Sequence, residues 1–182
     1  MTMIAENRKR KRTVSEHRTL VFPTDLGWMA LVCEERGVRE LHFGYSSQEG
    51  LRRQRNIQPT PKAHWTAPER LWVDQLQRFA RGEAVQLNDI PIVKSQGTEF
   101  QHAVLKACRA IRRGATMTYG ELACQVGCPG AARAVGTVMS RNVLPLLIPC
   151  HRVLGQNGLG GYSAPRGIAM KRRLLKLESE TV

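Results

Sequence analysis

The chain has 182 residues, enough for one ordinary domain or two small ones, and its hydrophobic content of 42% is sufficient for a packed core. It shows no run of about 18 apolar residues and no charged-then-apolar signal segment, which argues against membrane insertion and secretion and predicts a cytoplasmic protein. Its five cysteines lack regular spacing and are odd in number, which favours free thiols in a reducing compartment over a disulfide framework.

The net charge of +13 is distributed unevenly along the chain. Residues 19–96 carry ten basic and nine acidic side chains, whereas residues 97–182 carry twelve and four. Lys and Arg gain affinity for a polyanion by releasing its counterions, so the second half is predicted to face nucleic acid. A basic surface that is merely solvated is the alternative that charge alone leaves open.

Residues 1–17 include Arg8-Lys9-Arg10-Lys11-Arg12, a block of like charge with few large apolar neighbours. Such a segment cannot bury enough surface to order itself, so it predicts a disordered tail. Two roles stay open for it, nonspecific affinity for DNA and an inert solubilising arm.

A first α/β domain is predicted over residues 18–95. Three strand-like runs, at 20–22, 28–33 and 38–43, are separated by short turn-rich spacers and predict an antiparallel meander. The polar stretch 45–65 predicts a loop with a short helix around Leu51. Thr66-Ala67-Pro68-Glu69 has the form of a capping box and opens a helix that ends near Gly82. The helix face predicted to cover the sheet carries Leu71, Trp72, Leu76 and Phe79.

A second domain is predicted over residues 96–182. The preceding segment, Val85 to Val93, contains Pro91 and therefore favours a linker or an edge strand. Thr98 and Gln101 form a second capping box, and Gly114 is predicted to end the helix that follows. The buried face of this helix is marked by Phe100, Val104, Cys108 and Ile111.

Helix, glycine-rich turn and helix then follow in the order of a helix-turn-helix motif. Thr118 and Glu121 form a third capping box for a helix through Val126, and a second helix runs from Ala131 to about Arg141. Its first turns carry the small residues Ala131, Ala132, Ala134 and Gly136, which allow close approach of a partner or, alternatively, tight helix–helix packing. Cys124 and Cys128 are four residues apart, which is not a zinc-knuckle spacing, and both are assigned to packing.

Cys150 is followed directly by His151 and Arg152 and preceded by Pro149. The proline restricts the backbone, so the thiol is predicted to lie on a rigid, non-helical segment. A thiol reacts as thiolate, and His151 and Arg152 offer a base and a positive charge to form one. For such a pair alone, a buried structural cysteine is the alternative. The glycines after Val153 form turns or line a pocket, and an amphipathic helix over residues 168–177 leads to Glu178.

Pro149-Cys150-His151-Arg152-Val153, with Arg133-Ala134-Val135-Gly136 and Asn142 before it and Gly161-Tyr162 after it, resembles the acceptor-site signature of the O6-alkylguanine-DNA alkyltransferases. These are the methylated-DNA–protein-cysteine methyltransferases, and the resemblance extends from about residue 97 to residue 178. It implies an α/β protein with a small, ribonuclease H-like N-terminal antiparallel sheet and a mostly helical, winged helix-turn-helix-like second domain.

The resemblance also implies a reaction. Cys150 attacks the alkyl carbon of a flipped O6-alkylguanine, or O4-alkylthymine, in double-stranded DNA and keeps the alkyl group, so each molecule of this DNA repair enzyme acts once. It implies that the protein needs no cofactor, that its partner is double-stranded DNA rather than a membrane, and that it acts as a monomer.

Residue roles are implied by position in the motif. His151 is the base that deprotonates Cys150 through a bound water, and Glu178 orients His151. Tyr119 and Arg133 rotate the target nucleotide and fill its place in the stack, and Asn142 is the hinge that holds the thiol segment. The recognition helix, with Ala132, Ala134 and Gly136, lies in the minor groove, and the alkylguanine pocket consists of Tyr162, Ser163 and Val153.

The chain departs from the family pattern at three points. Val143 stands where many relatives have proline, and Ala164-Pro165 stands where a glycine pair is common, which affects the hinge and the lip of the pocket. The zinc ligands of some relatives have no clear counterparts among Cys33, His17, His42 and His64, so no zinc site is predicted. Two rival classes are a binding-only relative, which lacks the cysteine, and a Cys-His hydrolase, which regenerates its thiol.

Overall fold

The computed structural model describes residues 17–179. The predicted disordered tail, apart from its last residue, lies outside this range. Within it, no helix is both long enough and apolar enough to cross a membrane.

The N-terminal half is built on a three-stranded antiparallel sheet of β1 (Arg18–Phe22), β2 (Trp28–Glu34) and β3 (Gly37–Tyr45), in that order. Leu20 pairs with Leu31, and Leu31 pairs with Leu41, so these three side chains share one face of the sheet. All three are buried. The predicted meander is therefore confirmed.

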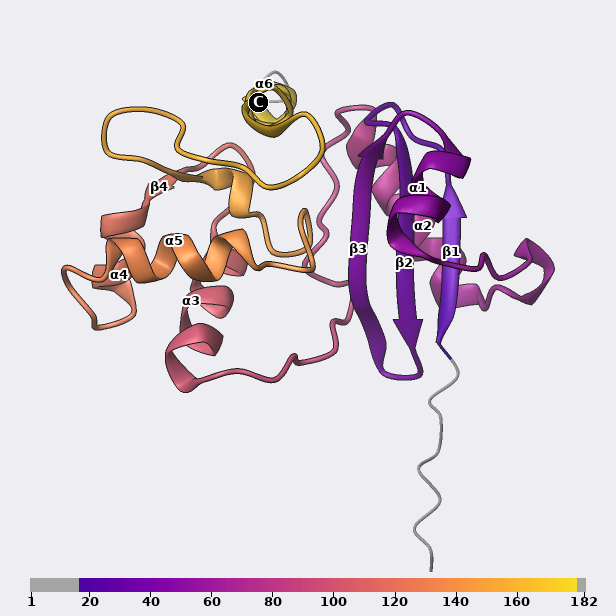
Figure 1. Ribbon diagram of the computed structural model, residues 1–182, viewed down its shortest axis with the longest axis horizontal. Helices are drawn as coiled ribbons and strands as arrows, with labels where there is room; N and C mark the ends of the chain where they lie inside the picture. The colour runs from indigo at the N-terminus through magenta and orange to yellow at the C-terminus, as the bar shows by residue number, and fades with distance from the viewer. Residues whose placement is uncertain (1–16, 180–182) are drawn as a thin grey trace, which may run out of the picture.

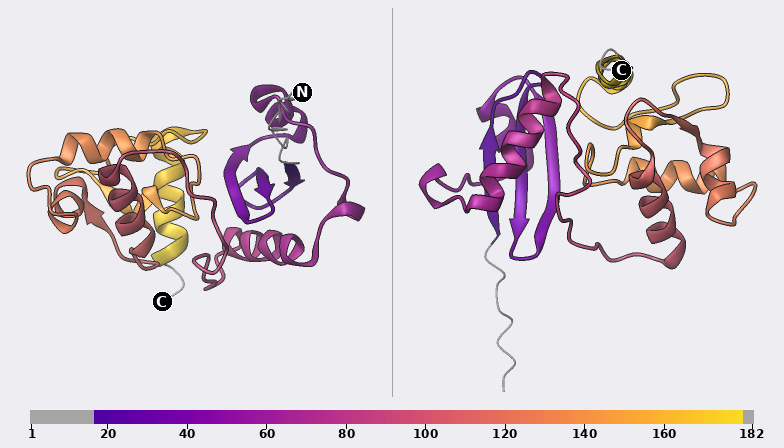
Figure 2. Two further views of the ribbon diagram at one scale, coloured as in Figure 1. Left: turned by 90° about the horizontal axis from the view of Figure 1, so that it is seen from below. Right: turned by 180° about the vertical axis from the view of Figure 1, so that it is seen from behind.

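Helices cover both faces of this sheet (Figures 1 and 2). α1 (Gln48–Arg55), the short helix predicted around Leu51, packs Leu51 against Val21 and Ala30. A single 3-10 turn, η1 (Lys62–His64), leads to α2 (Ala67–Ala80), which covers the opposite face. The sheet is therefore enclosed on both sides.

The predicted capping box of α2 is confirmed, but one residue of its predicted inner face is wrong. The Thr66 side chain accepts from the Glu69 backbone N–H, and Glu69 Oε2 accepts from the Thr66 N–H. Leu71 is 58% exposed. Val73 is buried in its place, because positions two residues apart differ by about 200° around a helix axis and cannot share a face.

A chain segment along the edge of the sheet connects the two halves. Ile92 forms an isolated parallel bridge to Val38, and the Val38 N–H donates to the Pro91 carbonyl at 2.8 Å. This confirms the predicted edge segment around Pro91. One hydrophobic cluster extends from the sheet into the C-terminal helices, and the boundary near residue 95 stays a prediction.

The C-terminal half is mostly helical and contains the predicted helix-turn-helix. α3 (Glu99–Ala110) and α4 (Tyr119–Gln125) both begin with the predicted capping boxes, and α5 (Ala132–Ser140) follows the glycine turn. Two details were wrong. α3 ends at Ala110, four residues before Gly114, because Ile111 is extended. Cys124 is exposed rather than packed, since it lies on the outer face of α4.

The remaining elements bring the end of the chain back to this motif. η2 (Cys150–Arg152) is a 3-10 turn, and β5 (Val153–Leu154) pairs in parallel with β4 (Met117–Thr118), a contact that the sequence did not predict. α6 (Gly167–Ser179) is the predicted terminal helix. It lies against η2, so the two motif residues Cys150 and Glu178 are placed in neighbouring elements.

Candidate active site around Cys150

Cys150 begins the 3-10 turn η2 and is only 6% exposed. The Arg152 N–H donates to the Pro149 carbonyl at 2.9 Å, which closes the turn. The predicted non-helical segment is therefore wrong for Cys150 itself. Pro149 does not prevent the turn, because a residue at the start of a helix needs no backbone N–H.

Asn142 ties the end of α5 to the segment that carries the thiol. Its Nδ2 donates to the Ile148 carbonyl at 2.8 Å, and its Oδ1 accepts from the Leu144 N–H at 3.0 Å. The neighbouring Val143 carbonyl accepts a hydrogen bond from the Leu41 N–H on β3 at 2.9 Å. The segment that leads to the thiol is thus attached to both the end of α5 and the N-terminal sheet.

Behind the thiol, three buried side chains form one hydrogen-bonded network. His151 Nε2 lies 2.9 Å from Glu178 Oε1. Arg152 donates to both carboxylate oxygens of Glu178, at 2.8 and 2.9 Å, and to the Ile111 carbonyl. His151 is 0% and Glu178 1% exposed, so these bonds are shielded from solvent.

The network keeps Glu178 ionised and His151 neutral. Burial acts to raise the pKa of Glu178, but hydrogen bonds from His151 and Arg152 outweigh it and lower that pKa to about 2. Burial lowers the pKa of His151, with Glu178 opposing it. An ionised carboxylate only accepts hydrogen bonds, so a neutral His151 carries its proton on Nε2. Its Nδ1 is buried without a hydrogen-bond partner among the described residues and can accept a proton.

The positive charge that acts on the thiol comes from Lys171 rather than from Arg152. Arg152 is occupied by Glu178 and the Ile111 carbonyl. Burial raises the pKa of Cys150, while hydrogen bonding by Asn142 and the charge of Lys171 act to lower it. The resting group is therefore a thiol that needs a proton acceptor.

Lys171 was not among the predicted site residues. Its side chain is fully buried, and its Nζ donates to the Val153 carbonyl at 2.6 Å. A sequence signal for it exists, because Lys171 precedes Glu178 by seven residues, or two helical turns, and so shares its face of α6. A helix that directs Glu178 toward His151 also directs Lys171 toward the site.

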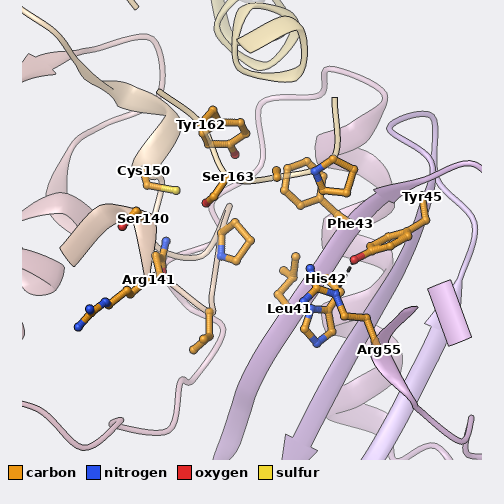
Figure 3. A pocket seen from close by; sticks show the side chains of 15 residues that line it. Leu41, His42, Phe43, Tyr45, Arg55, Ser140, Arg141, Cys150, Tyr162 and Ser163 are labelled. Carbon is orange, nitrogen blue, oxygen red and sulfur yellow. Dashed lines mark hydrogen bonds between the residues drawn. The ribbon is translucent and has the colours of Figure 1, made fainter. Parts of the chain in front are cut away.

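Two cavities flank the thiol, and both are lined by Ser140, Cys150, Tyr162 and Ser163. One, of about 450 Å³, is bordered by Tyr119 and by α5. The other, of about 340 Å³, lies between the thiol and the N-terminal sheet (Figure 3). Of the predicted pocket residues, Tyr162 and Ser163 line both. Val153 is fully buried in β5 and lines neither.

The small residues predicted on α5 face outward. Ala134 and Arg133 are exposed, and Ala132 and Gly136 are half-buried. A Cβ added at Gly136 would meet no atom within 4 Å, so packing inside the protein does not require this glycine. Arg133, Ala132 and Gly136 line an open groove together with Tyr119. The arrangement leaves the first turns of α5 free for a partner.

Tyr119, at the start of α4, lies close to both the glycine loop and Lys171. Gly160, at φ +69°, passes so close that a Cβ there would lie 3.0 Å from the Tyr119 ring. The Lys171 Nζ lies over the Tyr119 ring, 5.9 Å from its centroid. Among the described residues, no group of three His, Cys, Asp or Glu side chains is arranged to hold a metal ion.

Comparison with known proteins identifies the family. Residues 99–180 match the family model described as the DNA-binding domain of 6-O-methylguanine DNA methyltransferase. The methylated-DNA–protein-cysteine methyltransferase of Methanosarcina acetivorans is 35% identical over 162 residues, covering 87% of this chain and 96% of the relative. That of Mycobacterium bovis is 44% identical over 121 residues, covering 64% and 71%.

A solved structure gives the same result for the fold. The crystal structure of Mycobacterium tuberculosis OGT in complex with DNA superposes with a TM-score of 0.69 at 34% identity, over 90% of this chain and 93% of that one. The predicted fold class, a small antiparallel sheet followed by a mostly helical half, is confirmed. The chain belongs to the methylated-DNA–protein-cysteine methyltransferase family.

Proposed function

We propose that the protein repairs O6-alkylguanine, and O4-alkylthymine, in double-stranded DNA by transferring the alkyl group irreversibly to Cys150. The observation that carries this proposal is a thiol between two cavities, backed by His151, whose Nδ1 is free and whose Nε2 is held by Glu178. Family membership and the DNA complex of the Mycobacterium tuberculosis relative support it. The protein would act as a monomer inside the cell.

The transfer is a single displacement. The sulfur of Cys150 forms a bond to the carbon attached to O6 as the C–O6 bond breaks, and the electron pair passes to O6. The thiol proton passes to His151 and from there to solvent, and the guanine takes up one proton from solvent at N1 as its carbonyl is restored, so atoms and charge balance. No step releases the alkyl group from the thioether, and each molecule therefore acts once.

His151 is suited to receive the proton through a water molecule. Its buried Nδ1 is a polar atom without a described partner, and such sites in proteins commonly hold an ordered water. Glu178, ionised at neutral pH, stabilises the imidazolium that forms. This is the arrangement of nucleophile, base and orienting group that activated thiols use.

The target base must leave the duplex to reach a thiol that is 6% exposed. Tyr119 borders both the cavity beside the thiol and the open groove on α5, and Arg133 lines that groove. We assign this groove of the protein as the surface that binds the minor groove of DNA, because the small side chains on α5 allow the two to approach closely. Tyr119 would rotate the nucleotide, and Arg133 would occupy its place in the stack.

The proposal is tested by intact-mass measurement after mixing the protein with DNA that contains O6-methylguanine. We expect each chain to gain one methyl group, located on Cys150 by peptide mapping, with one equivalent of DNA repaired. Cys150→Ser should bind the DNA and gain no methyl group, because a hydroxyl does not ionise near neutral pH. Repair beyond one equivalent would favour the hydrolase alternative. Methylation of Cys108 or Cys124 would overturn the assignment of Cys150.

The role of Arg133 is tested separately with two substrates. Arg133→Ala should slow repair of duplex DNA on the order of tenfold, because it loses a contact that stabilises the extruded nucleotide. Reaction with the free base O6-benzylguanine, which needs no extrusion, should change little. Equal losses with both substrates would assign Arg133 to structural support.

A further inference from the structure

Glu178, which the proposed transfer requires, lies in the last turn of α6. The last four carbonyls of an α-helix have no N–H partner within the helix, so this turn frays unless other groups bind it. Glu178 is nevertheless 1% exposed, and its Oε1 lies 2.9 Å from His151 Nε2. Contacts from outside α6 must therefore hold the turn in place.

Arg113, in the connection between α3 and β4, binds this turn. Its Nη2 donates to the Leu177 carbonyl at 3.0 Å, one of the end carbonyls that α6 itself leaves unpaired. The next residue adds a weaker contact, because the Gly114 N–H donates to Glu178 Oε2 at 3.4 Å. Burial lowers the pKa of Arg113, and the negative charge of Glu178 opposes that effect, so the two groups interact. Arg113 thus caps the turn that carries Glu178.

The same guanidinium group is held by the N-terminal half. Its Nη2 also donates to the Gly82 carbonyl, just after α2, at 2.8 Å. The guanidinium carbon lies 5.3 Å from the centroid of the Phe79 ring, which is 1% exposed in the core. A Cβ added at Gly82 would lie 3.7 Å from the Leu177 side chain, so the ends of α2 and α6 are close, as the left view of Figure 2 shows. Arg113 therefore ties the end of α6 to a buried part of the N-terminal half.

We propose that Arg113 is a positioning residue for alkyl transfer. It fixes the last turn of α6 against the end of α2, so that Glu178 keeps its contact with His151. The inference rests on the proposed alkyl transfer and adds to it a residue outside the acceptor motif. It also gives the N-terminal half a part in activating the thiol, through the end of α2.

Loss of this tie should act through the basicity of His151. Burial lowers the pKa of His151, and the hydrogen bond and charge of Glu178 oppose that effect. The other charged groups that act on this pKa, Arg152 and Lys171, lower it. A carboxylate that moves away leaves His151 a weaker base, so less of the Cys150 thiol is deprotonated near neutral pH. Transfer should then slow at neutral pH and recover as pH rises and hydroxide replaces the base.

The test is Arg113→Met, which keeps a long side chain beside Phe79 and removes the hydrogen-bond donors. Single-turnover transfer from the free base O6-benzylguanine is followed by intact mass from mildly acidic to mildly basic pH, so that DNA binding does not enter. The rate near neutral pH should fall about three- to tenfold, the scale of one lost hydrogen bond, and approach that of the unaltered protein as pH rises. Arg113→Lys keeps the charge on a shorter side chain and should slow transfer only about twofold, with the same recovery.

Arg109→Met is the matched control. Arg109 lies four residues earlier, in α3, and its Nη2 donates to the Asn88 and Ile90 carbonyls of the connecting segment at 2.8 and 2.7 Å. Its loss should lower the free energy of unfolding in urea without changing the pH profile of transfer. A double variant, Arg113→Met with Glu178→Gln, should be no slower than Glu178→Gln alone, because Arg113 acts through that carboxylate.

Transfer by the unaltered protein separates this inference from the proposed function. If no alkyl group reaches Cys150, both fail. If it does and a folded Arg113→Met protein keeps the rate and pH profile of the unaltered protein, only the inference fails. An unchanged Arg113→Lys would overturn it in the same way, and this variant decides the question if Arg113→Met does not fold. A loss that adds in full to that of Glu178→Gln would also overturn it, because Arg113 would then act independently of Glu178.

Discussion

Two buried regions of this protein contain the same three kinds of side chain, yet only one is built for chemistry. In the N-terminal half, Cys33 lies near Glu69, which is ion-paired with Arg18 at 2.6 Å. In the C-terminal half, Cys150 is followed by His151, which contacts Glu178 at 2.9 Å, and Glu178 is ion-paired with Arg152. Both glutamates are 1% exposed. A buried thiol beside a buried carboxylate and an arginine is therefore not by itself the mark of an active site.

The two regions differ because only the one around Cys150 has a proton acceptor and a cavity beside the thiol. Cys33 is fully enclosed in the core, where burial raises its pKa to about 12, and no histidine is among the groups that act on it. Glu69 is occupied in capping α2. Glu178 instead accepts a hydrogen bond from His151 Nε2, and His151 Nδ1 has no hydrogen-bond partner among the described residues. Cys150 also lines two cavities. A histidine nitrogen without a described partner, together with a thiol that lines two cavities, distinguishes the C-terminal region.

Removing the charge of Glu178 is expected to have the largest effect on the difference between the two regions. Glu178→Gln keeps a hydrogen-bonding side chain of the same shape but cannot stabilise the imidazolium of His151. We expect alkyl transfer to slow by on the order of ten- to a thousandfold near neutral pH, the range of a lost acid–base contribution. The transfer rate of this variant should climb with pH toward that of the unaltered protein, as hydroxide takes over deprotonation.

Single-turnover rates across the pH range check this expectation, with circular dichroism to establish that the variant is folded. An unchanged pH profile in Glu178→Gln would mean that Glu178 acts only as a structural partner of Arg152, as Glu69 does for Arg18. Lys171 would then be the remaining charge that acts on Cys150.

The same two regions show what a sequence can predict. Capping boxes are local patterns of four residues, and all three predicted ones are present, at Thr66, Thr98 and Thr118. The signature around Cys150 likewise identified His151 and Glu178, which the fold brings to 2.9 Å across 27 positions of sequence. The catalytic and DNA-binding roles assigned to individual residues stay predictions.

What could not be predicted depends on contacts between distant segments. Arg152 lies only two residues after the thiol in sequence, but its side chain binds Glu178 and the Ile111 carbonyl instead. In the sequence, Lys171 is one of several basic residues on a helix. Only the structure shows that its ammonium group donates to the Val153 carbonyl. The wall that β3 and α1 contribute to the second cavity has no signal in the motif, since it arises only when the two halves pack together.

A second, smaller effect is a dependence of stability on pH through Glu178. The pKa of Glu178 is about 2 in the folded protein against an ordinary 4.5, so the folded state holds this proton less tightly than the unfolded state. The resulting stability is fully present above pH about 4.5 and is lost as pH falls toward about 2, and it amounts to about 3 kcal/mol. Urea unfolding between about pH 6 and pH 3 should show that Glu178→Gln is less stable at the upper end and approaches the unaltered protein at the lower end. A difference that stays constant with pH would contradict the low pKa.

The smallest effect is expected from Glu69→Gln, which should lower stability without changing the rate of alkyl transfer. The amide can still accept from the Thr66 N–H but loses the charge opposite Arg18, whose side chain is 35% exposed. The free energy of unfolding should fall by about 1 kcal/mol, the scale of a weakened helix cap. The rate of alkyl transfer should not change, because Glu69 touches neither the thiol network nor either cavity. Urea unfolding and single-turnover transfer, measured on the same preparation, check both parts. A folded Glu69→Gln protein that transfers slowly would show that the sheet governs the thiol after all, and the Leu41–Val143 hydrogen bond to the hinge is the contact through which it would act.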